Sequence, residues 1–192
     1  VAVTRDMRLS SPSLTKAFID GVTLQGVDVH DAGLAGTDMM YYAVASAGLM
    51  GGAQITASHN PKQYNGCKMV KAEAFPLSGE SGIREMKELL LTNSLPAPSA
   101  RRGTVTPITI MAPYIEHVMG FIDPTVIQSF NTVLDGGSGI AGLVAPHLFD
   151  RQPCRTTRLC FAVDGTFPNH EANPLLEENR EERTAEVIRQ KA

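Results

Sequence analysis

Short apolar segments alternate with longer amphipathic segments in the amino-terminal part of the chain, and this alternation strongly limits the choice of fold. Val1–Thr4, Val27–His30 and Gly51–Ala57 have the length and composition of strands. The stretches between them, 11–26 and 37–48, carry apolar residues at helical spacing. Strands that alternate with helices at this pitch predict βαβ units, in which helices cover both faces of a mixed, mainly parallel sheet.

The spacing of the apolar residues also predicts which face of each helix is buried. The expected core residues are Leu14, Ala17, Phe18, Gly21 and Val22 in the first helix, Met40, Tyr41, Val44 and Ala47 or Gly48 in the second, and Ile83, Met86 and Leu90 in a third helix over Glu80–Leu91. Lys68–Val70 has the composition of another strand. A helix over Pro113–Ile122 ends at Asp123-Pro124, where we place the domain boundary, because proline terminates helices.

A second strand–helix–strand pattern follows this boundary. The strand Thr132–Asp135 leads through a glycine-rich turn into a helix that ends near Phe149, and Thr157–Val163 has the composition of the next strand. A charged helix is expected from Asn173-Pro174 to the last residue. The predicted organisation is one α/β domain at residues 1–123 and a second, incomplete α/β domain at residues 124–192.

Composition excludes several classes of function. The 192 residues are 43% hydrophobic and 19% charged, which is typical of a globular protein. A net charge of −3 gives no support for a nucleic-acid partner or for attraction to an anionic membrane surface. No apolar run reaches the roughly 18 residues that a membrane span requires. Three cysteines without paired spacing, and a first segment without the features of a signal peptide, favour the reducing cytoplasm.

The turn Gly137–Gly142 has the form G-x-G-x-x-G directly after a strand and before a helix. Asp164 follows at the end of the next predicted strand, where an acid could bind a ribose hydroxyl. This pattern permits a dinucleotide site with the pyrophosphate at the helix amino terminus. Any tight strand-to-helix turn also requires glycine, so a structural role for the same residues remains open.

The loop after the third strand gathers hydrogen-bonding side chains where a strand ends. Thr56, Ser58, His59 and Asn60 lie within five consecutive positions, and Lys68 follows inside a predicted strand. A hydroxyl can accept a phosphoryl group, an imidazole can move a proton and a cation can offset phosphate charge. The cluster therefore indicates phosphoryl transfer, although an isolated serine in such a place is more commonly a turn residue.

Taken together, these stretches resemble the α-D-phosphohexomutase family, which comprises phosphomannomutases and phosphoglucomutases. Four segments carry the resemblance in the family's order: VAVTRDMRLSSP, TASHNPKQYNGCKMV, VLDGGSGIAGLVAPHLF and VDGTFPNHEANPLLEEN. They depart from the family's pattern at Thr4, where glycine is usual, and at Ala172, where proline is usual. The serine-loop motif, T-[AG]-S-H-N-P in the family, is the most specific of the four. In this family the glycine turn is structural.

The resemblance implies a role for each residue of the serine loop. Ser58 would carry the phosphate and, through that phosphate, would be one ligand of a catalytic Mg²⁺. His59 would be the neighbouring active-site imidazole, and Lys68 would lie near the reacting hydroxyl and phosphate. Asn60 would shape the loop by hydrogen bonding.

Two arginines near the first strand are candidates for supporting this loop. Arg5 and Arg8 flank Asp6, so either could stabilise the loop or take part in an ordinary ion pair. The resemblance further implies the whole reaction. A phosphohexose mutase interconverts hexose 1-phosphate and hexose 6-phosphate, here of mannose or glucose, with Mg²⁺ and with a hexose 1,6-bisphosphate as intermediate and activator.

Several elements of the family have no counterpart in the sequence. The metal-binding D-G-D-x-D-R loop, the sugar-recognition G-E-x-S-G-H loop and the Y-D-I-R-G segment before the first strand do not occur in the 192 residues. We therefore expect an amino-terminal portion of a larger mutase, with domain 1 lacking its first strand and domain 2 incomplete, and inactive by itself. The alternatives are a dinucleotide-binding domain that uses Gly137–Gly142 and Asp164, and a non-catalytic α/β module.

Overall fold

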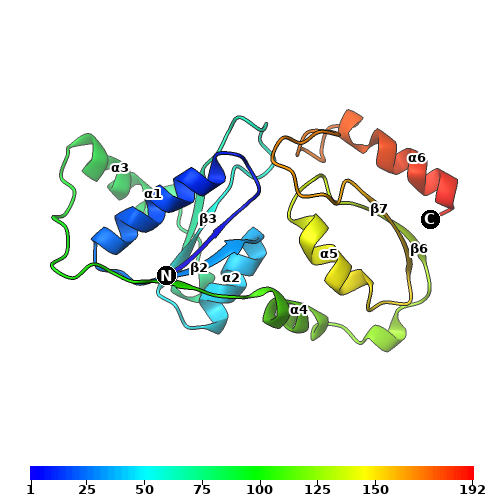
Figure 1. Ribbon diagram of the computed structural model, residues 1–192, viewed down its shortest axis with the longest axis horizontal. Helices are drawn as coiled ribbons and strands as arrows, with labels where there is room; N and C mark the ends of the chain where they lie inside the picture. Colours follow the sequence, from blue (N-terminus) through cyan, green and yellow to red (C-terminus); the bar gives the residue numbers. More distant parts are fainter. The chain divides into compact units, whose positions relative to one another are not determined.

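The computed structural model describes all 192 residues, which divide into two compact units (Figure 1). The first unit comprises Val1–Arg5, Ser10–Thr56 and Gly66–Thr109, and the second comprises Asp6–Leu9, Ala57–Asn65 and Ile110–Ala192. Two short loops of the amino-terminal half therefore belong to the second unit, and one of them is the predicted serine loop. The domain boundary that we place at Asp123-Pro124 stays a prediction.

A five-stranded sheet forms the centre of the first unit. The strands, in the spatial order β4-β3-β1-β2-β5, are β1 (Ala2–Arg5), β2 (Val29–Leu34), β3 (Gly51–Ile55), β4 (Cys67–Lys71) and β5 (Val105–Pro107). β4 pairs antiparallel with β3, and all the other neighbouring strands are parallel. The predicted α/β class with a mixed, mainly parallel sheet is confirmed.

Two helices connect the central strands of this sheet. α1 (Ser11–Leu24) joins β1 to β2, and α2 (Thr37–Ser46) joins β2 to β3. The first crossover moves from β1 to its neighbour β2, whereas the second returns past β1 to β3. Because such crossovers are right-handed, helices that run across the sheet in opposite senses cover opposite faces. Figure 1 shows α1 and α2 to either side of β1.

A polar pair lies inside the core of the first unit. Thr4 and Gln54 face each other in the register of β1 and β3, and both are buried. The Thr4 hydroxyl donates a hydrogen bond to Gln54 Oε1, and Gln54 Nε2 donates to the carbonyl of Ala35 at 3.0 Å. Because the buried hydroxyl has a partner, a polar side chain is accommodated inside this core.

The buried face of α1 differs from the predicted one. Its buried residues are Ser11, Thr15 and Thr23, while the predicted core residue Leu14 is 42% exposed. Of the other residues expected inside, Phe18 and Val22 are half-buried, and Ala17 and Gly21 are exposed. Small hydroxyl side chains fit where a helix lies close to a sheet, and the Thr23 hydroxyl donates to the helix carbonyl of Ile19 at 2.9 Å.

The other two helices of this unit give a mixed outcome. α2 buries Met40 and Val44 as predicted, together with Met39 and Ala43, but Tyr41 is half-buried and Ala47 and Gly48 are exposed. α3 (Arg84–Leu91) follows the short turns η1 (Ala72–Ala74) and η2 (Gly79–Ile83) and buries no residue. The prediction that Ile83, Met86 and Leu90 are core residues is therefore wrong, because α3 packs against η2 and not on the sheet.

The carboxyl-terminal part of the second unit is also built from strand, helix and strand. β6 (Asn131–Asp135) and β7 (Arg155–Leu159) pair in parallel, and α5 (Ala141–Phe149) connects them. α4 (Met111–Met119), followed by the turn η3 (Pro124–Val126), packs against α5. This confirms that the α/β pattern is repeated. None of the helices in either unit combines the length and apolar character needed to cross a bilayer.

The last helix begins later than predicted. α6 spans Glu181–Gln190, directly after the turn η4 (Glu178–Arg180), and packs against β6. Asn173 does not cap this helix, because its side chain accepts a hydrogen bond from the N–H of Leu175 at 3.1 Å and so closes a separate turn. The strand β7 is shifted as well, since it ends at Leu159 and not at Val163.

Candidate active site

Ser58 lies in a tight turn that follows β3 in the chain. The Ala57 carbonyl accepts hydrogen bonds from the backbone N–H of Asn60 at 3.1 Å and from Asn60 Nδ2 at 2.8 Å. Ser58 itself has φ = 55°, a left-handed conformation that costs a residue with a side chain about 1–2 kcal/mol. The turn leaves Ser58 and His59 exposed. The surrounding contacts therefore hold a strained backbone that presents a hydroxyl and an imidazole side by side.

Hydrogen bonds from the side chain of Arg8 fasten this loop, residues 57–65, in place. Its side chain is buried, and its Nε donates to Asp6 Oδ2 at 3.1 Å. The two terminal nitrogens donate to four loop carbonyls, those of Ser58 (2.9 Å), Asn60 (2.8 Å), Pro61 (2.8 Å) and Tyr64 (3.1 Å). Arginine has five N–H donors in a rigid fork, so every donor of Arg8 is engaged. Arg8 therefore forms an ion pair with Asp6 and also holds the loop that carries Ser58.

A later segment of the chain, which includes Gly165 and Phe167, packs against Arg8 and its neighbour Met7. The ring of Phe167 is buried, and its centroid lies 5.4 Å from the guanidinium carbon of Arg8. A Cβ atom on Gly165 would lie 2.3 Å from the carbonyl oxygen of Met7, so this close approach requires glycine. Residues 6–9, 57–65 and 164–167 therefore pack together although they are far apart in the sequence.

The predicted site residues fall in both units. The second unit holds Ser58, His59, Asn60 and Arg8. The first unit holds Arg5, which ends β1 and is half-buried, and Lys68, which is exposed on β4. The structure brings the first four residues together, and the roles assigned to all six stay predictions.

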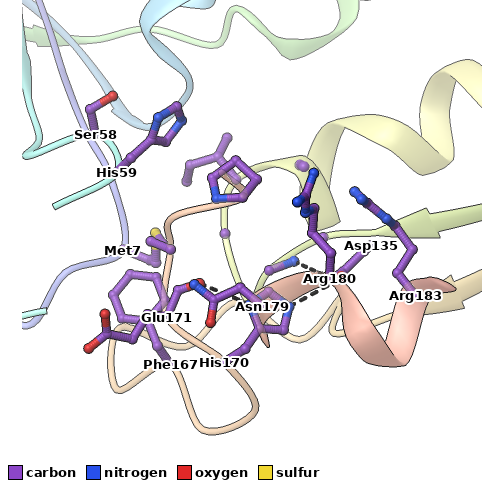
Figure 2. A pocket seen from close by; sticks show the side chains of 17 residues that line it. Met7, Ser58, His59, Asp135, Phe167, His170, Glu171, Asn179, Arg180 and Arg183 are labelled. Carbon is purple, nitrogen blue, oxygen red and sulfur yellow. Dashed lines mark hydrogen bonds and ion pairs between the residues drawn. The ribbon is translucent and has the colours of Figure 1, made fainter. Parts of the chain in front are cut away.

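A cavity of about 340 Å³ opens beside Ser58 and His59 within the second unit. The glycine turn, Phe167 and His170 contribute to its lining, and so do two arginines, Arg180 from η4 and Arg183 from α6. Figure 2 shows Ser58 and His59 at one side of this cavity and the two arginines at another. We did not predict Arg180 and Arg183 as site residues from the sequence. The only sequence signal is their spacing of three residues, which places both side chains on one helical face.

The glycine turn after β6 is shaped by close packing. A Cβ atom on Gly142 would lie 2.2 Å from the carbonyl oxygen of Phe161, and one on Gly136 would lie 2.9 Å from that of Cys160. The N–H of Ser138 donates to the Cys160 carbonyl at 2.7 Å. The glycines therefore let the turn lie directly against the chain that leaves β7. This supports the structural interpretation of the motif.

Asp164, the acid that a dinucleotide site would need, is engaged in a turn of its own. Its Oδ1 accepts a hydrogen bond from the backbone N–H of Thr166 at 2.8 Å, and this bond holds the pKa of Asp164 below its ordinary value. The N–H of Asp164 donates to the Ser138 carbonyl at 2.9 Å. Both contacts stabilise the local fold, and both weaken the case for a ribose-binding role.

Three chemically active side chains meet where β6 and β7 end. Asp135 closes β6, and its Oδ1 accepts a hydrogen bond from the N–H of Gly137 at 2.9 Å, while its Oδ2 lies 3.0 Å from His170 Nε2. Cys160 follows β7 and is half-buried. Burial first, and the charge of Asp135 second, raise the pKa of the Cys160 thiol. Asp135 and His170 line the cavity described above.

The sheet and the fastened loop define the class of the protein. It is an α/β protein in which a turn with an exposed serine follows a strand of a mainly parallel sheet. Residues 1–94 match the family model for phosphoglucomutase/phosphomannomutase, alpha/beta/alpha domain I. Residues 1–94 therefore belong to the phosphoglucomutase/phosphomannomutase family.

Relatives that match nearly the whole chain support this assignment. A phosphomannomutase of Escherichia coli is 38% identical over 197 residues, which cover 99% of this chain and 43% of the relative. A protein named phosphohexose mutases from Xanthomonas campestris pv. campestris (strain B100) is 34% identical, with 99% of this chain and 42% of the relative covered. The chain thus spans less than half the length of the relatives it matches.

A solved crystal structure has the same fold. The crystal structure of a phosphoglucomutase/phosphomannomutase family protein from Burkholderia thailandensis superposes with a TM-score of 0.88 at 31% sequence identity. The match covers 100% of this chain and 42% of that protein. The fold of the chain is therefore that of the corresponding part of the family protein.

Proposed function

We propose that this chain carries the phosphoserine part of a phosphohexose mutase, which interconverts hexose 1-phosphate and hexose 6-phosphate. The observation that carries the proposal is the fastened loop, in which four N–H donors of Arg8 bind loop carbonyls and Ser58 adopts a left-handed conformation with its side chain exposed. Similarity to a phosphomannomutase supports a hexose phosphate, of mannose or glucose, as the substrate. A non-catalytic module would not require such a strained, exposed serine.

The proposed reaction consists of two phosphoryl transfers. In the first, the bond between Ser58 Oγ and phosphorus breaks while phosphorus bonds to a free hydroxyl oxygen of the hexose phosphate, and His59 takes the hydroxyl proton and passes it to the departing Ser58 Oγ. The products are a hexose 1,6-bisphosphate and a free serine hydroxyl. In the second transfer, the bond between phosphorus and the other ester oxygen of the sugar breaks while that phosphate bonds to Ser58 Oγ, and the serine proton passes through His59 to the released sugar oxygen. Lys68 would offset the charge of the transferred group.

The cavity beside Ser58 supports binding of an anionic sugar. Its volume of about 340 Å³ is within the usual range of roughly 300–1,000 Å³ for small-molecule sites. Arg180 and Arg183 line it, and guanidinium groups bind phosphate oxygens in pairs of hydrogen bonds. We propose that they bind the phosphate of the sugar that is not being transferred.

Mg²⁺ belongs to the proposal for a complete mutase, but the residues present do not fit it. Mg²⁺ takes several oxygen ligands at near-octahedral angles. Two carboxylates line the cavity, Asp135 and Glu171, and an imidazole nitrogen rather than further oxygens lies beside Asp135. The phosphate on Ser58 would be one ligand, and this chain does not supply a full set. No step is therefore assigned to the metal.

The organisation of the chain and its compartment complete the proposal. Residues 1–123 would form domain 1 of the mutase and residues 124–192 the first part of domain 2. The cytoplasm is the proposed compartment, because Cys67, Cys154 and Cys160 are all free thiols. A hexose 1,6-bisphosphate is the proposed activator.

Replacement of Ser58 tests the proposal. We suggest a chimera in which this chain replaces the matching 43% of the Escherichia coli phosphomannomutase. Conversion of mannose 1-phosphate, with glucose 1,6-bisphosphate as activator, is measured before and after Ser58→Ala. The variant should lose turnover by at least about 1,000-fold, because removing a covalent nucleophile leaves only binding and electrostatic contributions.

Two controls accompany this measurement. Ser94→Ala removes an exposed hydroxyl from the first unit and should leave turnover unchanged. The 192-residue chain alone should give no turnover, since most of the length of its relatives is missing from it. Near-normal turnover of the Ser58→Ala chimera would exclude the phosphoserine role.

A further inference from the structure

Asp135, Cys160 and His170 form a cluster that performs no step of the proposed reaction, although Asp135 and His170 line the cavity beside Ser58. One ligand atom from each side chain can be chosen so that all three lie within 4.8 Å of one another. All three residues are half-buried, and they come from the end of β6, the end of β7 and the loop that follows. An imidazole, a thiol and a carboxylate this close together form a set of metal-ligand types.

The hydrogen bonds of His170 determine what its ring can offer to this cluster. Nδ1 lies 2.9 Å from the carbonyl oxygen of Glu171, which can only accept, so Nδ1 carries the hydrogen. Nε2 lies 3.0 Å from Asp135 Oδ2, which is also an acceptor. In a neutral ring, the lone pair of Nε2 would therefore face a carboxylate oxygen. A positive centre, either a second proton or a metal ion, must lie between them.

The surroundings of the cluster favour a metal ion over a second proton. A histidine ligand commonly donates its other ring N–H to a backbone carbonyl, as His170 does to Glu171. The free oxygen of a carboxylate ligand is commonly hydrogen-bonded in turn, as Asp135 Oδ1 is by the N–H of Gly137. An ion pair would explain His170 and Asp135 alone. Cys160, whose thiol is hydrogen-bonded to Asp135 and Asn169, adds a third metal-ligand type to the same group.

The ligand types select the metal. Zn²⁺ binds thiolate, imidazole and carboxylate in tetrahedral sites, whereas Mg²⁺ and Ca²⁺ take oxygen ligands. Two ligand atoms on one tetrahedral zinc lie roughly 3.3–3.6 Å apart, given the usual bond lengths. The observed 3.0 Å between His170 Nε2 and Asp135 Oδ2 would need only a small expansion. Three protein ligands leave a fourth position for water.

We propose that Asp135, Cys160 and His170 form a zinc site at the carboxyl ends of β6 and β7. The metal would connect the end of β6 to the segment that includes Gly165 and Phe167, which covers Arg8 beneath the serine loop. This site does not depend on the mutase proposal. It would stabilise the second unit whether or not phosphoryl transfer occurs.

Cobalt titration tests the site directly. The 192-residue chain is stripped with a chelator and titrated with Co²⁺, which reports a thiolate ligand by a charge-transfer band and tetrahedral geometry by visible bands. We expect one Co²⁺ per chain and full displacement by one equivalent of Zn²⁺. Absence of a thiolate band in the wild-type chain would overturn the proposal.

Matched variants identify the ligands. Cys160→Ser should remove the thiolate band, and His170→Gln and Asp135→Asn should each weaken Zn²⁺ binding by about 100-fold or more, since even groups that only hydrogen-bond to ligands contribute roughly 10- to 100-fold. Cys154→Ser and Cys67→Ser change the other free thiols and should leave the band intact. A band that survives Cys160→Ser, or that is lost with Cys154→Ser or Cys67→Ser, would refute the assignment. The wild-type titration stands even if a variant does not fold.

Discussion

Arg8 shows how a single buried residue can determine the conformation of a functional loop. Its guanidinium binds carbonyls about fifty positions further along the chain, at Ser58 and Asn60, and its Nε binds Asp6. A buried charge is tolerated only where it is paired and hydrogen-bonded, and Arg8 meets both conditions. The ring of Phe167 covers its face. The strained backbone of Ser58 therefore depends on a residue that precedes the first helix.

Arg8→Lys should weaken the loop although it preserves the charge. A lysine has three donors and no fork, so at least two partly buried acceptors would lose their partner, each at a cost of about 1–2 kcal/mol. We expect the free energy of unfolding to fall by roughly 2–4 kcal/mol. Limited proteolysis should then cut within residues 57–65. Urea unfolding and peptide mapping measure the two effects.

An exposed arginine of the same unit provides the control for Arg8. Arg151 forms an ion pair with Glu116 at 2.6 Å in which both side chains are substantially exposed. Arg151→Lys should change the free energy of unfolding by less than about 1 kcal/mol. If both lysine variants had equal effects, the loop would not depend on the fork of Arg8.

At the scale of elements, the segment after α3 is held by more contacts than its composition indicates. The sequence predicts an exposed, proline- and serine-rich linker at residues 93–103. The segment is exposed, but Arg101 pairs with Asp28 at 3.0 Å and Arg102 pairs with Asp20 at 3.0 Å. Asp28 also accepts hydrogen bonds from the N–H and the hydroxyl of Thr104. Asp28 thereby positions the chain as it enters β5.

The ionisation of Asp28 should make this contact sensitive to acid. Hydrogen bonds from Thr104 and then from Arg101 lower the pKa of Asp28 from 3.8 to about 2. Because the folded protein favours the ionised form, the stabilisation is complete above about pH 4 and is lost as the pH falls toward 2. Asp28→Asn should therefore lower the urea midpoint at pH 7, and the difference from wild type should shrink at the acid end.

Glu85→Gln, at an exposed position on α3, provides the comparison for Asp28. It should not change the urea midpoint measurably at pH 7. A midpoint difference for Asp28→Asn that stayed constant down to the acid end would show that the charge of Asp28 is not what holds the segment.

At the scale of the whole molecule, the two units differ in how well their strands are buried. In β1 of the first unit, Ala2, Val3 and Thr4 have no exposed surface, and all of β3 is buried. In β6 of the second unit, every residue is half-buried or exposed, and its sheet has two strands. A sheet of two strands is marginally stable unless other elements pack against it. The first unit therefore has the stronger core.

Hydrogen exchange should reveal this difference. In the presence of a chelator, amides of β1 and β3 should exchange more slowly than those of β6 and β7, because local opening costs least where little apolar surface is buried. Added Zn²⁺ should slow exchange at β6 and β7 and leave β1 and β3 unchanged. Equal protection of β1 and β6 without metal would contradict the expected difference in stability.

Local spacing was enough to predict the main features of this protein. Alternating strands and helices indicated a mainly parallel sheet, which the structure confirms, because this pattern depends on residues that are neighbours in the chain. The turn around Ser58 indicated phosphoryl chemistry for the same reason, and this role stays a prediction. The glycines of the turn after β6 were recognisable for the same reason. Their structural role came from the resemblance and not from the spacing, because the packing of Gly142 against Phe161 depends on a segment that follows β7.

Only the tertiary structure decided which faces are buried and which distant groups meet. The buried residues of α1 are hydroxyl residues and α3 buries none, because burial depends on what lies beneath a helix and not only on its own pattern. Arg8 reaches the serine loop, and Asp135, Cys160 and His170 gather, because parallel strands end at one edge and bring separate loops together.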